Sequence, residues 1–369
     1  MQPIKFTLFD PITIGAVQCA NRVLMAPLTR CRALPFSDAP HALNARYYTQ
    51  RATAGLIISE ATQVMPEGKG YPGTPGIYSP EQQAGWKLVT DAVHAANGKI
   101  FAQLWHVGAI SHPDLQPGNV LPVAPSAINP GGTIYTQHGK RERVTPRALQ
   151  TEEIPVIIAA YKHSAALAKR AGFDGVEIHS ANGYLLEQFI RDSSNHRTDQ
   201  YGGSITNRLR LTLDIVDAAI SVWGADRVGI RLSPVSPANG CKPDSTSQAT
   251  YGKLVEELAA RKIAYLHFIE GVTGGERKLE GFDFAQARRS FRGTYIANNK
   301  YTRQMAVDAV SNGSADAIAF GVPFIANPDL PRRLQLNASL NTANPKTFYT
   351  PGSEGYTDYS TLEQERTAV

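Results

Sequence analysis

A regular alternation of short apolar runs with helical patterns is the feature that most constrains the fold of this sequence. The eight apolar runs span residues 23–27, 56–61, 99–106, 175–181, 228–234, 264–271, 294–299 and 317–321. Helical patterns follow most of them and cover residues 42–54, 80–96, 151–171, 206–223, 247–262, 303–312 and 327–336. Eight βα units predict an α/β fold, a closed (β/α)8 TIM barrel. A doubly wound open sheet is the alternative, and it is disfavoured because no G-x-G-x-x-G fingerprint directly follows a run.

Three segments lie outside this alternation. The opening FTLFDPITIG predicts two short strands around Asp10-Pro11, a hairpin that could cap one end of the barrel. Residues 106–150 follow the third strand and are rich in Pro, Gly and Thr, which predicts a long flap over the barrel mouth. Residues 337–369 are polar and are expected to be a surface-wrapping tail. We therefore expect residues 1–369 to form a single domain.

Charge and cysteine content limit the partners and the compartment. The 37 basic and 32 acidic residues give a net charge of +5, and the basic residues are scattered, which argues against nucleic acid as a partner. The three cysteines are far apart and show neither the spacing of a disulfide framework nor a CxxC metal site. Such cysteine usage is typical of proteins in a reducing compartment. No stretch is apolar enough to span a bilayer. These features predict a cytoplasmic protein without a membrane partner.

Lys140, Arg141, Arg143 and Arg147 form a basic cluster in the predicted flap. Clusters of this kind are most often a solvated face. The alternative is that they contact the phosphates of a dinucleotide.

The chemistry of α/β barrels lies at the C-terminal ends of the strands. In this chain those ends carry an amide, a hydroxyl, a guanidinium and small residues, without a carboxylate pair, a cysteine or a cluster with metal-ligand spacing. Hydrolysis by two acids, thiol catalysis and metal catalysis are therefore disfavoured, and no metal is expected. A bound organic cofactor would have to supply the reactive atom.

The fourth strand end, GVEIHSANGY (175–184), carries the most reactive set. His179 and Asn182 can both donate hydrogen bonds to one oxygen, and the phenol of Tyr184 can supply a proton. The alternative is a polar strand end in which each side chain is satisfied locally.

Seven segments of the chain resemble one known family. They are MAPLTR (25–30), EATQVMPEGKGYPGTPGIYS (60–79), AQLWHVG (102–108), HSANGYLLEQFIRDSSNHRTDQYGGSITNR (179–208), IRLSP (230–234), AFGVPFIANPDL (319–330) and EGYTDY (354–359). All are similar to the old yellow enzyme family, FMN-dependent ene reductases on a (β/α)8 barrel. The resemblance runs from about residue 8 to 359, and its thirty-residue block from His179 is very specific.

The resemblance implies a set of FMN contacts. Thr29 would donate to flavin O4, Gln103 would pair with the pyrimidine edge, and Arg231 would lie beside N1 and O2, where negative charge collects on reduction. A buried salt bridge is the alternative role for Arg231. The implied cofactor-binding residues are Pro27, Leu28, Thr29, Ala61, Gln103 and Arg231 at the ring, and Asn299, Gly321 and Val322 at the phosphate.

The resemblance also assigns the substrate side of the site. His179 and Asn182 would hold the carbonyl oxygen of an unsaturated substrate, as an oxyanion hole does, and Tyr184 would protonate its α-carbon. Trp105 would form a wall of the pocket, with an ordinary core position as its alternative. Tyr349 could reach the mouth from the tail.

The chain departs from the family pattern at the phosphate site. The family usually has Gly near position 299 and a basic residue after Gly321, whereas this chain has Asn299 and Val322. Backbone N–H groups there could still donate to the phosphate. Arg303 or Lys300 could replace the missing guanidinium.

The sequence therefore predicts a flavin oxidoreductase in which NADPH (or NADH) reduces FMN. The reduced cofactor would deliver hydride to an enone, enal, maleimide or nitroalkene. The alternative is a barrel that binds a phosphorylated ligand or a phenol with little or no turnover. Either way, we expect a monomer or homodimer that acts on small molecules.

Overall fold

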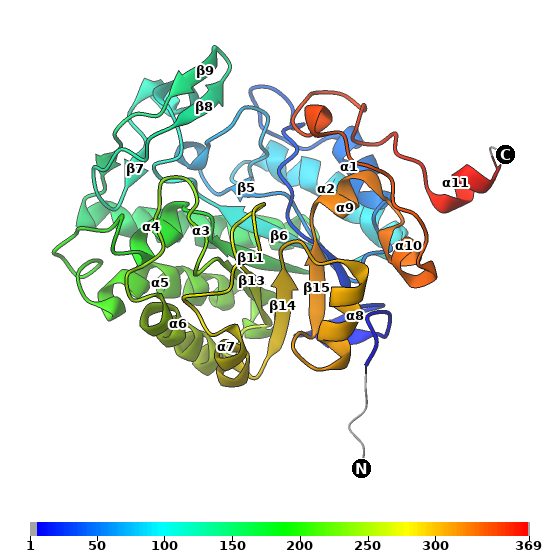
Figure 1. The fold of residues 1–369 in the computed structure, drawn as a ribbon. Coiled ribbons are helices and arrows are strands. Elements are labelled where there is room, and N and C mark those ends of the chain that lie inside the picture. The colour runs from blue at the N-terminus through cyan, green and yellow to red at the C-terminus, as the bar shows by residue number, and fades with distance from the viewer. Residues whose placement is uncertain (1–5, 368–369) are drawn as a thin grey trace.

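Eight parallel strands pair in a closed ring in the computed structural model, which describes residues 6–367 (Figure 1). In chain order they are β3 (Val23–Met25), β4 (Ile57–Ile58), β6 (Ile100–Trp105), β11 (Gly175–Ser180), β12 (Val228–Leu232), β13 (Tyr265–Ile269), β14 (Thr294–Asn298) and β15 (Ala317–Phe320). The ring closes because β15 pairs with β3, and a short ninth strand, β5 (Thr62–Gln63), extends the sheet beside β6. The predicted (β/α)8 barrel and its eight strands are confirmed.

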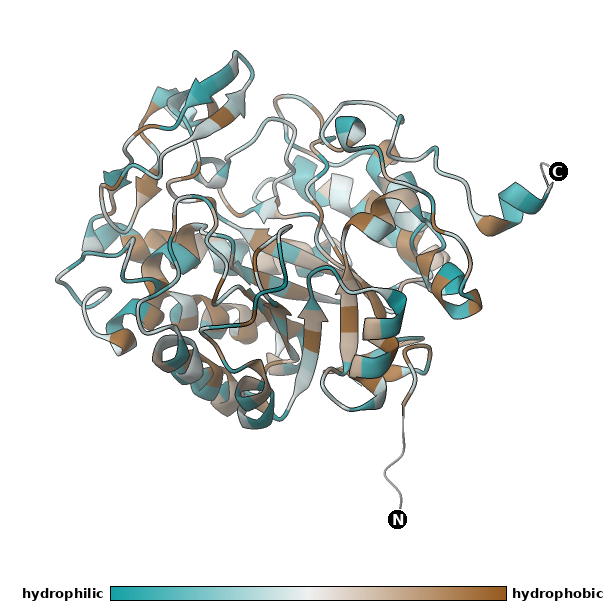
Figure 2. Ribbon diagram, in the orientation of Figure 1, coloured by the Kyte–Doolittle hydropathy of each residue, from teal (hydrophilic) through white to brown (hydrophobic). Residues whose placement is uncertain are grey.

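Helices cover the outside of the barrel. The long ones are α1 (Ala42–Thr49), α2 (Pro80–Ala95), α3 (Ile154–Arg170), α5 (Ile205–Trp223), α6 (Ser247–Arg261), α7 (Phe284–Phe291) and α8 (Arg303–Ser311), and the short ones are α4 (Leu185–Ile190), α9 (Val322–Ala326), α10 (Leu330–Leu336) and α11 (Leu362–Thr367). Figure 2 shows mostly hydrophobic residues along the strands and mixed colours on the helices. No helix in the described range is long and apolar enough to cross a membrane.

The helical pattern of α7 was missed. Phe284, Ala287 and Phe291 are buried at the helical spacing of i, i+3 and i+7, but the helix has only eight residues and so is easily overlooked in the sequence. Its start is set by the Asp283 side chain, which accepts a hydrogen bond of 2.8 Å from the N–H of Gln286.

The predicted N-terminal hairpin exists, but its turn was placed wrongly. Strands β1 (Ile12–Ile14) and β2 (Val17–Cys19) pair antiparallel around Gly15-Ala16, after the Asp10-Pro11 step. Gly15 has φ +55°, and a Cβ there would lie 1.9 Å from the carbonyl oxygen of Asp226, so this tight approach requires glycine. Asp226 comes just before β12, and Ile14 and Val17 join the apolar cluster inside the barrel. The hairpin therefore closes the N-terminal end of the barrel.

The long segment after β6 contains the predicted flap. Its tip is a hairpin of β8 (Thr133–Thr136) and β9 (Gly139–Glu142), and its base is β7 (Val123–Ala124) paired with β10 (Arg147–Ala148). Figure 1 shows the hairpin beyond the C-terminal ends of the strands. The basic residues of the flap do not share one surface. Those at 140, 141 and 147 are exposed, whereas Arg143 donates to Asn239 Oδ1 at 2.9 Å.

Two arginines that follow β3 hold the tail beside the barrel mouth. Arg30 donates to the carbonyls of Phe348 (3.0 Å) and Gly355 (2.7 Å), and Arg32 donates to those of Thr347 (3.0 Å) and Gly352 (2.8 Å). These contacts place the tail next to the segment that carries Thr29. Residues 1–5 and 368–369 of the predicted domain lie outside the described residues.

Candidate active site

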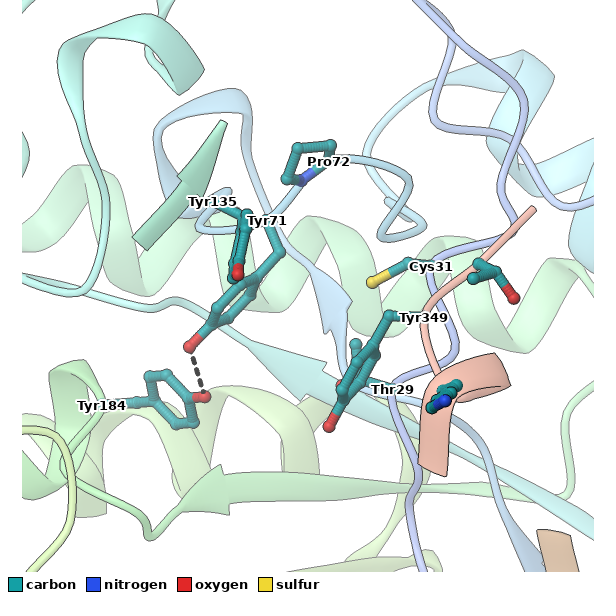
Figure 3. A pocket seen from close by; sticks show the side chains of 9 residues that line it. Thr29, Cys31, Tyr71, Pro72, Tyr135, Tyr184 and Tyr349 are labelled. Carbon is teal, nitrogen blue, oxygen red and sulfur yellow. Dashed lines mark hydrogen bonds between the residues drawn. The ribbon is translucent and has the colours of Figure 1, made fainter. Parts of the chain in front are cut away.

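A cavity of about 760 Å³ opens at the C-terminal end of the barrel (Figure 3). Residues from the β3 end, the loop after β5, the flap, the loop after β11 and the tail line it: Thr29, Cys31, Tyr71, Pro72, Tyr135, Tyr184, Lys346, Tyr349 and Thr350. Figure 3 shows Tyr71 and Tyr184 on one side and Thr29, Cys31 and Tyr349 on the other. The predicted position of Tyr349 at the mouth is thus what the structure shows, with 66% of its surface exposed.

Hydrogen bonds to buried side chains fix the backbone of the loop after β11. Asn182 and Gly183 both have positive φ, so the chain turns sharply there. Buried Glu187 accepts hydrogen bonds from the Gly183 N–H (2.6 Å) and from Ser233 Oγ (2.7 Å), and it pairs with Arg191 at 2.9 Å. Sequence reasoning missed Glu187, whose role depends on contacts made only in the fold.

His179 lies near the C-terminal end of β11 and is a neutral donor. Its Nδ1 accepts a hydrogen bond of 3.3 Å from the Ala181 N–H, so the ring proton is on Nε2. Burial, and then the positive charge of Arg231, hold the pKa of His179 well below its usual range. At neutral pH the imidazole therefore offers one N–H and no charge.

Asn182 offers a second donor. Thr273 Oγ1 donates to Asn182 Oδ1 at 2.7 Å, which orients the amide. The backbone of Asn182 is held as well, since its N–H donates to Ser233 Oγ at 2.8 Å. With Oδ1 engaged, the NH₂ group of Asn182 is left to bind a ligand oxygen. Thr273, from the loop after β13, was not predicted.

Tyr184 begins α4 and faces the cavity beside these donors. Its ring packs edge-to-face against Trp105 and His179, with ring centroids 4.9 Å and 5.2 Å apart. Its hydroxyl oxygen lies 3.1 Å from that of Tyr71. Burial raises the pKa of Tyr184 well above the usual value, so the phenol keeps its proton. The structure thus brings together His179, Asn182, Tyr184 and Trp105, as predicted, and adds Tyr71.

Trp105 belongs to a buried apolar cluster and packs behind Tyr71, which lines the cavity. Its indole is 1% exposed and stacks on Tyr71 at 5.9 Å and 11°. Its Nε1 is buried, and no described residue accepts a hydrogen bond from it.

Inward-facing side chains of neighbouring strands form a polar floor below the cavity. Gln103 on β6 donates to Glu177 on β11 at 2.7 Å, and His267 on β13 contacts the same carboxylate at 2.8 Å. Arg231 on β12 donates to Asn298 Oδ1 at 2.9 Å, while its Nε is buried without an acceptor in the described part of the chain. Burial lowers the pKa of Arg231 to about 10, so it stays charged at neutral pH.

This floor fits the pyrimidine edge of a flavin. The Gln103 amide keeps its carbonyl oxygen and one N–H for a ligand, because the other N–H is used by Glu177. The unpartnered Nε of Arg231 adds a charged donor. A flavin edge offers matching acceptors and a donor. For Glu177 the sequence predicts only a place in a strand, and no pattern marks it as a site residue.

The end of β3 and the end of β4 border the same space. Thr29 lines the cavity, and the N–H of the next residue donates to Glu60 Oε2 at 3.2 Å, which ties the two strand ends together. Ala61 belongs to the buried apolar cluster of Trp105. Pro27 and Leu28 are half-buried, and Leu28 lies beside Gly321.

The ends of β14 and β15 form an unusual backbone. Asn299 has φ +108° and Lys300 has φ +51°, so position 299 keeps a glycine-like conformation without glycine. The Asn299 side chain supports it by donating to the carbonyls of Glu270 (2.9 Å) and Val272 (3.0 Å). Apart from the bonds of the strand ladders, no backbone hydrogen bond from the N–H of Asn299 or Gly321 is found in the described residues.

These free N–H groups fit a phosphate, as an anion-binding loop requires. Val322, the first residue of α9, is 52% exposed, so its N–H and the space around its side chain are open. The two candidate substitutes for the missing guanidinium differ. Arg303 Nε donates to the carbonyl of Leu334 at 2.6 Å, whereas Lys300 is exposed.

The described residues support neither metal nor thiol chemistry at the mouth. Among them, no group of His, Cys, Asp and Glu side chains is arranged to hold a metal ion. Burial raises the pKa of Cys31 to about 12, so this cavity thiol is not a thiolate at neutral pH.

Comparison with known proteins identifies the family. The family model described as NADH:flavin oxidoreductase / NADH oxidase matches residues 7–341. The chain is 44% identical to 12-oxophytodienoate reductase 1 of Oryza sativa subsp. japonica, over 97% of this chain and 93% of the relative.

Solved structures agree with this. Morphinone reductase is 45% identical with a TM-score of 0.92, over 99% of both chains. The old yellow enzyme homologue from Zymomonas mobilis is 44% identical with a TM-score of 0.93, over 97% of this chain and 100% of that one. The predicted resemblance and the FMN cofactor are therefore confirmed. The chain belongs to the NADH:flavin oxidoreductase / NADH oxidase family, which includes the old yellow enzymes, and is an FMN-dependent oxidoreductase.

Proposed function

We propose that this protein is an ene reductase that uses NAD(P)H and FMN to reduce activated C=C bonds, with residues 1–369 acting as one FMN-binding domain. The observation that carries the proposal is the cluster of three groups at the end of β11 and in the loop that follows it. Neutral His179 and oriented Asn182 supply two donors, and protonated Tyr184 lies next to them. Bound FMN would supply the hydride chemistry between the nicotinamide and the β-carbon of the alkene.

The floor and the strand ends would hold the cofactor. We assign Gln103 to the pyrimidine edge, Arg231 to the charge that builds at N1 and O2, and Thr29 to O4. Pro27, Leu28 and Ala61 would border the ring. The N–H groups of Asn299, Gly321 and Val322 would bind the phosphate.

The residues of the β11 loop would act on the substrate. His179 Nε2–H and the Asn182 NH₂ hold the carbonyl or nitro oxygen and stabilise the negative charge that develops on it. Tyr184 gives its proton to the α-carbon. Trp105 and Tyr349 provide aromatic surface for a flat, unsaturated substrate.

The relatives are named for reductions of 12-oxophytodienoate and morphinone, and one morphinone reductase structure contains tetrahydroNAD, which supports a nicotinamide reductant. We propose NADPH rather than NADH on family resemblance alone. We also propose a cytoplasmic location and activity as a monomer or homodimer.

Anaerobic reduction tests this function. The purified protein is expected to be yellow, to lose its colour on addition of NADPH, and to regain it when 2-cyclohexenone is added. A protein that binds phenols but is not bleached by NADPH or NADH would support the alternative of a barrel without turnover.

Val322→Arg is expected to tighten FMN binding. The side chain at this position is half exposed, so a longer one has room beside the free N–H groups. A charge-assisted hydrogen bond to a phosphate contributes about 10–100-fold in affinity, and solvent at the site favours the lower figure. Titration of apo-protein with FMN, followed by quenching of flavin fluorescence, measures the change.

Val322→Gln is the matched control for this variant, because it adds length without charge and should have a much smaller effect. Equal dissociation constants for wild type and Val322→Arg would mean that another cation, such as Lys300, already contacts the phosphate. Weaker binding by the arginine variant would contradict the placement of the phosphate beside Val322.

A further inference from the structure

Tyr184 shares its hydroxyl with a second phenol. Tyr71 comes from the loop between β5 and α2, and its hydroxyl oxygen lies 3.1 Å from that of Tyr184 (Figure 3). Its ring is fixed by stacking on Trp105 at 5.9 Å, and its backbone carbonyl accepts a hydrogen bond of 2.8 Å from Thr74. Tyr71 and Tyr184 both line the cavity, so the Tyr71 phenol can exchange protons with the solvent that fills the mouth.

Loss of the Tyr184 proton leaves a phenolate, and Tyr71 can stabilise it by donating a hydrogen bond. A tyrosinate in this half-buried position is costly unless a donor stabilises it. His179, the titratable group against the other side of the ring, is neutral, and its Nε2–H is committed to the substrate oxygen in the proposed function. Arg143 of the flap lowers the pKa of both phenols by its charge but is held by Asn239. Asn239 also lowers the pKa of Tyr184 through a side-chain hydrogen bond, but an amide cannot give up its proton. Tyr71 is the titratable group in direct contact with the phenol oxygen.

We propose that Tyr71 is a relay residue, which stabilises the Tyr184 phenolate as it forms and then returns a proton to it. This inference rests on the proposed role of Tyr184. In the step, the Tyr184 O–H bond breaks as the α-carbon C–H bond forms. The Tyr71 proton then moves to the Tyr184 oxygen, and Tyr71 takes a proton from water in the cavity. The water that gives this proton is left as hydroxide, which the solvent neutralises. No oxidation state changes in these transfers, and the net result is one proton carried from solvent to product.

The Tyr71 and Tyr184 hydroxyls are already arranged for proton transfer before substrate binds. Burial raises the pKa of both phenols, and the hydrogen bond between them raises that of Tyr184 while it lowers that of Tyr71. Either hydroxyl can be the donor before substrate arrives, because the two phenol oxygens are 3.1 Å apart. When the Tyr184 proton leaves, the Tyr71 hydroxyl can donate to the Tyr184 oxygen by rotation alone, without any movement of heavy atoms. Because Tyr71 acts through Tyr184, it is a positioning residue.

Tyr71→Phe in the holoenzyme tests the relay, since it removes one oxygen and keeps the stacked ring. Stopped-flow re-oxidation by 2-cyclohexenone is expected to slow about 10–100-fold, the value of a hydrogen bond to a charged group. The solvent deuterium isotope effect on this step should rise, because proton transfer becomes more limiting. Reduction by NADPH and re-oxidation by a nitroalkene should keep their wild-type rates. Tyr135→Phe is the matched control, since this flap tyrosine is 67% exposed and lies on the same side of the cavity.

The outcomes separate the relay from the proposed function. Slow enone re-oxidation in Tyr184→Phe with a wild-type rate and isotope effect in Tyr71→Phe would overturn the relay and leave the proton donor in place. Wild-type rates in both variants would overturn the role of Tyr184 and the relay with it. A Tyr71→Phe variant that is slowed equally with the enone, the nitroalkene and NADPH would show a structural role and also overturn the relay.

Discussion

Tyr184→Phe is expected to slow the re-oxidation of the reduced enzyme by an enone about 10²–10⁴-fold, the usual contribution of a general acid. The phenol is the protonated group next to the two donors that would hold the carbonyl oxygen, and burial keeps its pKa well above the usual value. Only the second half-reaction needs this proton. FMN binding and reduction by NADPH should therefore be unchanged, and separate stopped-flow measurements of the two half-reactions will show this.

A nitroalkene provides the control for Tyr184→Phe. Its product after hydride transfer is a stable nitronate, so its re-oxidation rate should fall far less than that of an enone. Phenylalanine keeps the edge contacts of the ring with Trp105 and His179, which limits structural side effects. Unchanged enone re-oxidation would contradict the assignment of Tyr184 as the proton donor.

The barrel was predictable because its strands are continuous apolar runs that are buried on both faces. Each of the eight runs contains one strand of the ring. The missed helix α7 has the helical spacing of buried residues, but at eight residues it is too short to stand out from the loops around it. The hairpin turn was misplaced because Asp10-Pro11 is a strong local turn signal, whereas Gly15 is needed for an approach to Asp226 that only the fold reveals.

The site residues that could be predicted depend on local sequence, whereas the missed ones depend on contacts made only in the fold. His179, Asn182 and Tyr184 are close in sequence and follow one strand, so their meeting could be predicted. Tyr71 and Thr273 reach the same place from loops about 110 and 90 residues away from Tyr184 and Asn182. Contacts of this kind depend on how loops of different βα units meet at the barrel mouth, and no local pattern encodes them.

Simultaneous replacement of His179 and Asn182 by alanine is expected to weaken the binding of para-substituted phenols about 10²–10⁴-fold. Each residue would give one hydrogen bond to a charged oxygen, and each such bond contributes about 10–100-fold. The resemblance to old yellow enzymes implies that a phenolate bound over the flavin takes the place of the substrate carbonyl and gives a long-wavelength charge-transfer band. Titration of the band measures the loss, and the single variants should fall between wild type and the double variant.

Thr273→Val gives the sharpest control for this pair, because it changes neither donor. The Thr273 hydroxyl holds Asn182 Oδ1 at 2.7 Å, and valine of nearly the same shape cannot donate. The amide would then be free to rotate and present its oxygen to the phenolate, so phenol affinity should fall in this variant too, by less than in Asn182→Ala. His179 keeps its own hydrogen bond from Ala181 and should be unaffected.

A charge-transfer band that persists in the double variant at the same phenol concentration would mean that a different pair of donors holds the ligand oxygen. Wild-type affinity in Thr273→Val together with a loss in Asn182→Ala would mean that the backbone contact with Ser233 alone orients the amide.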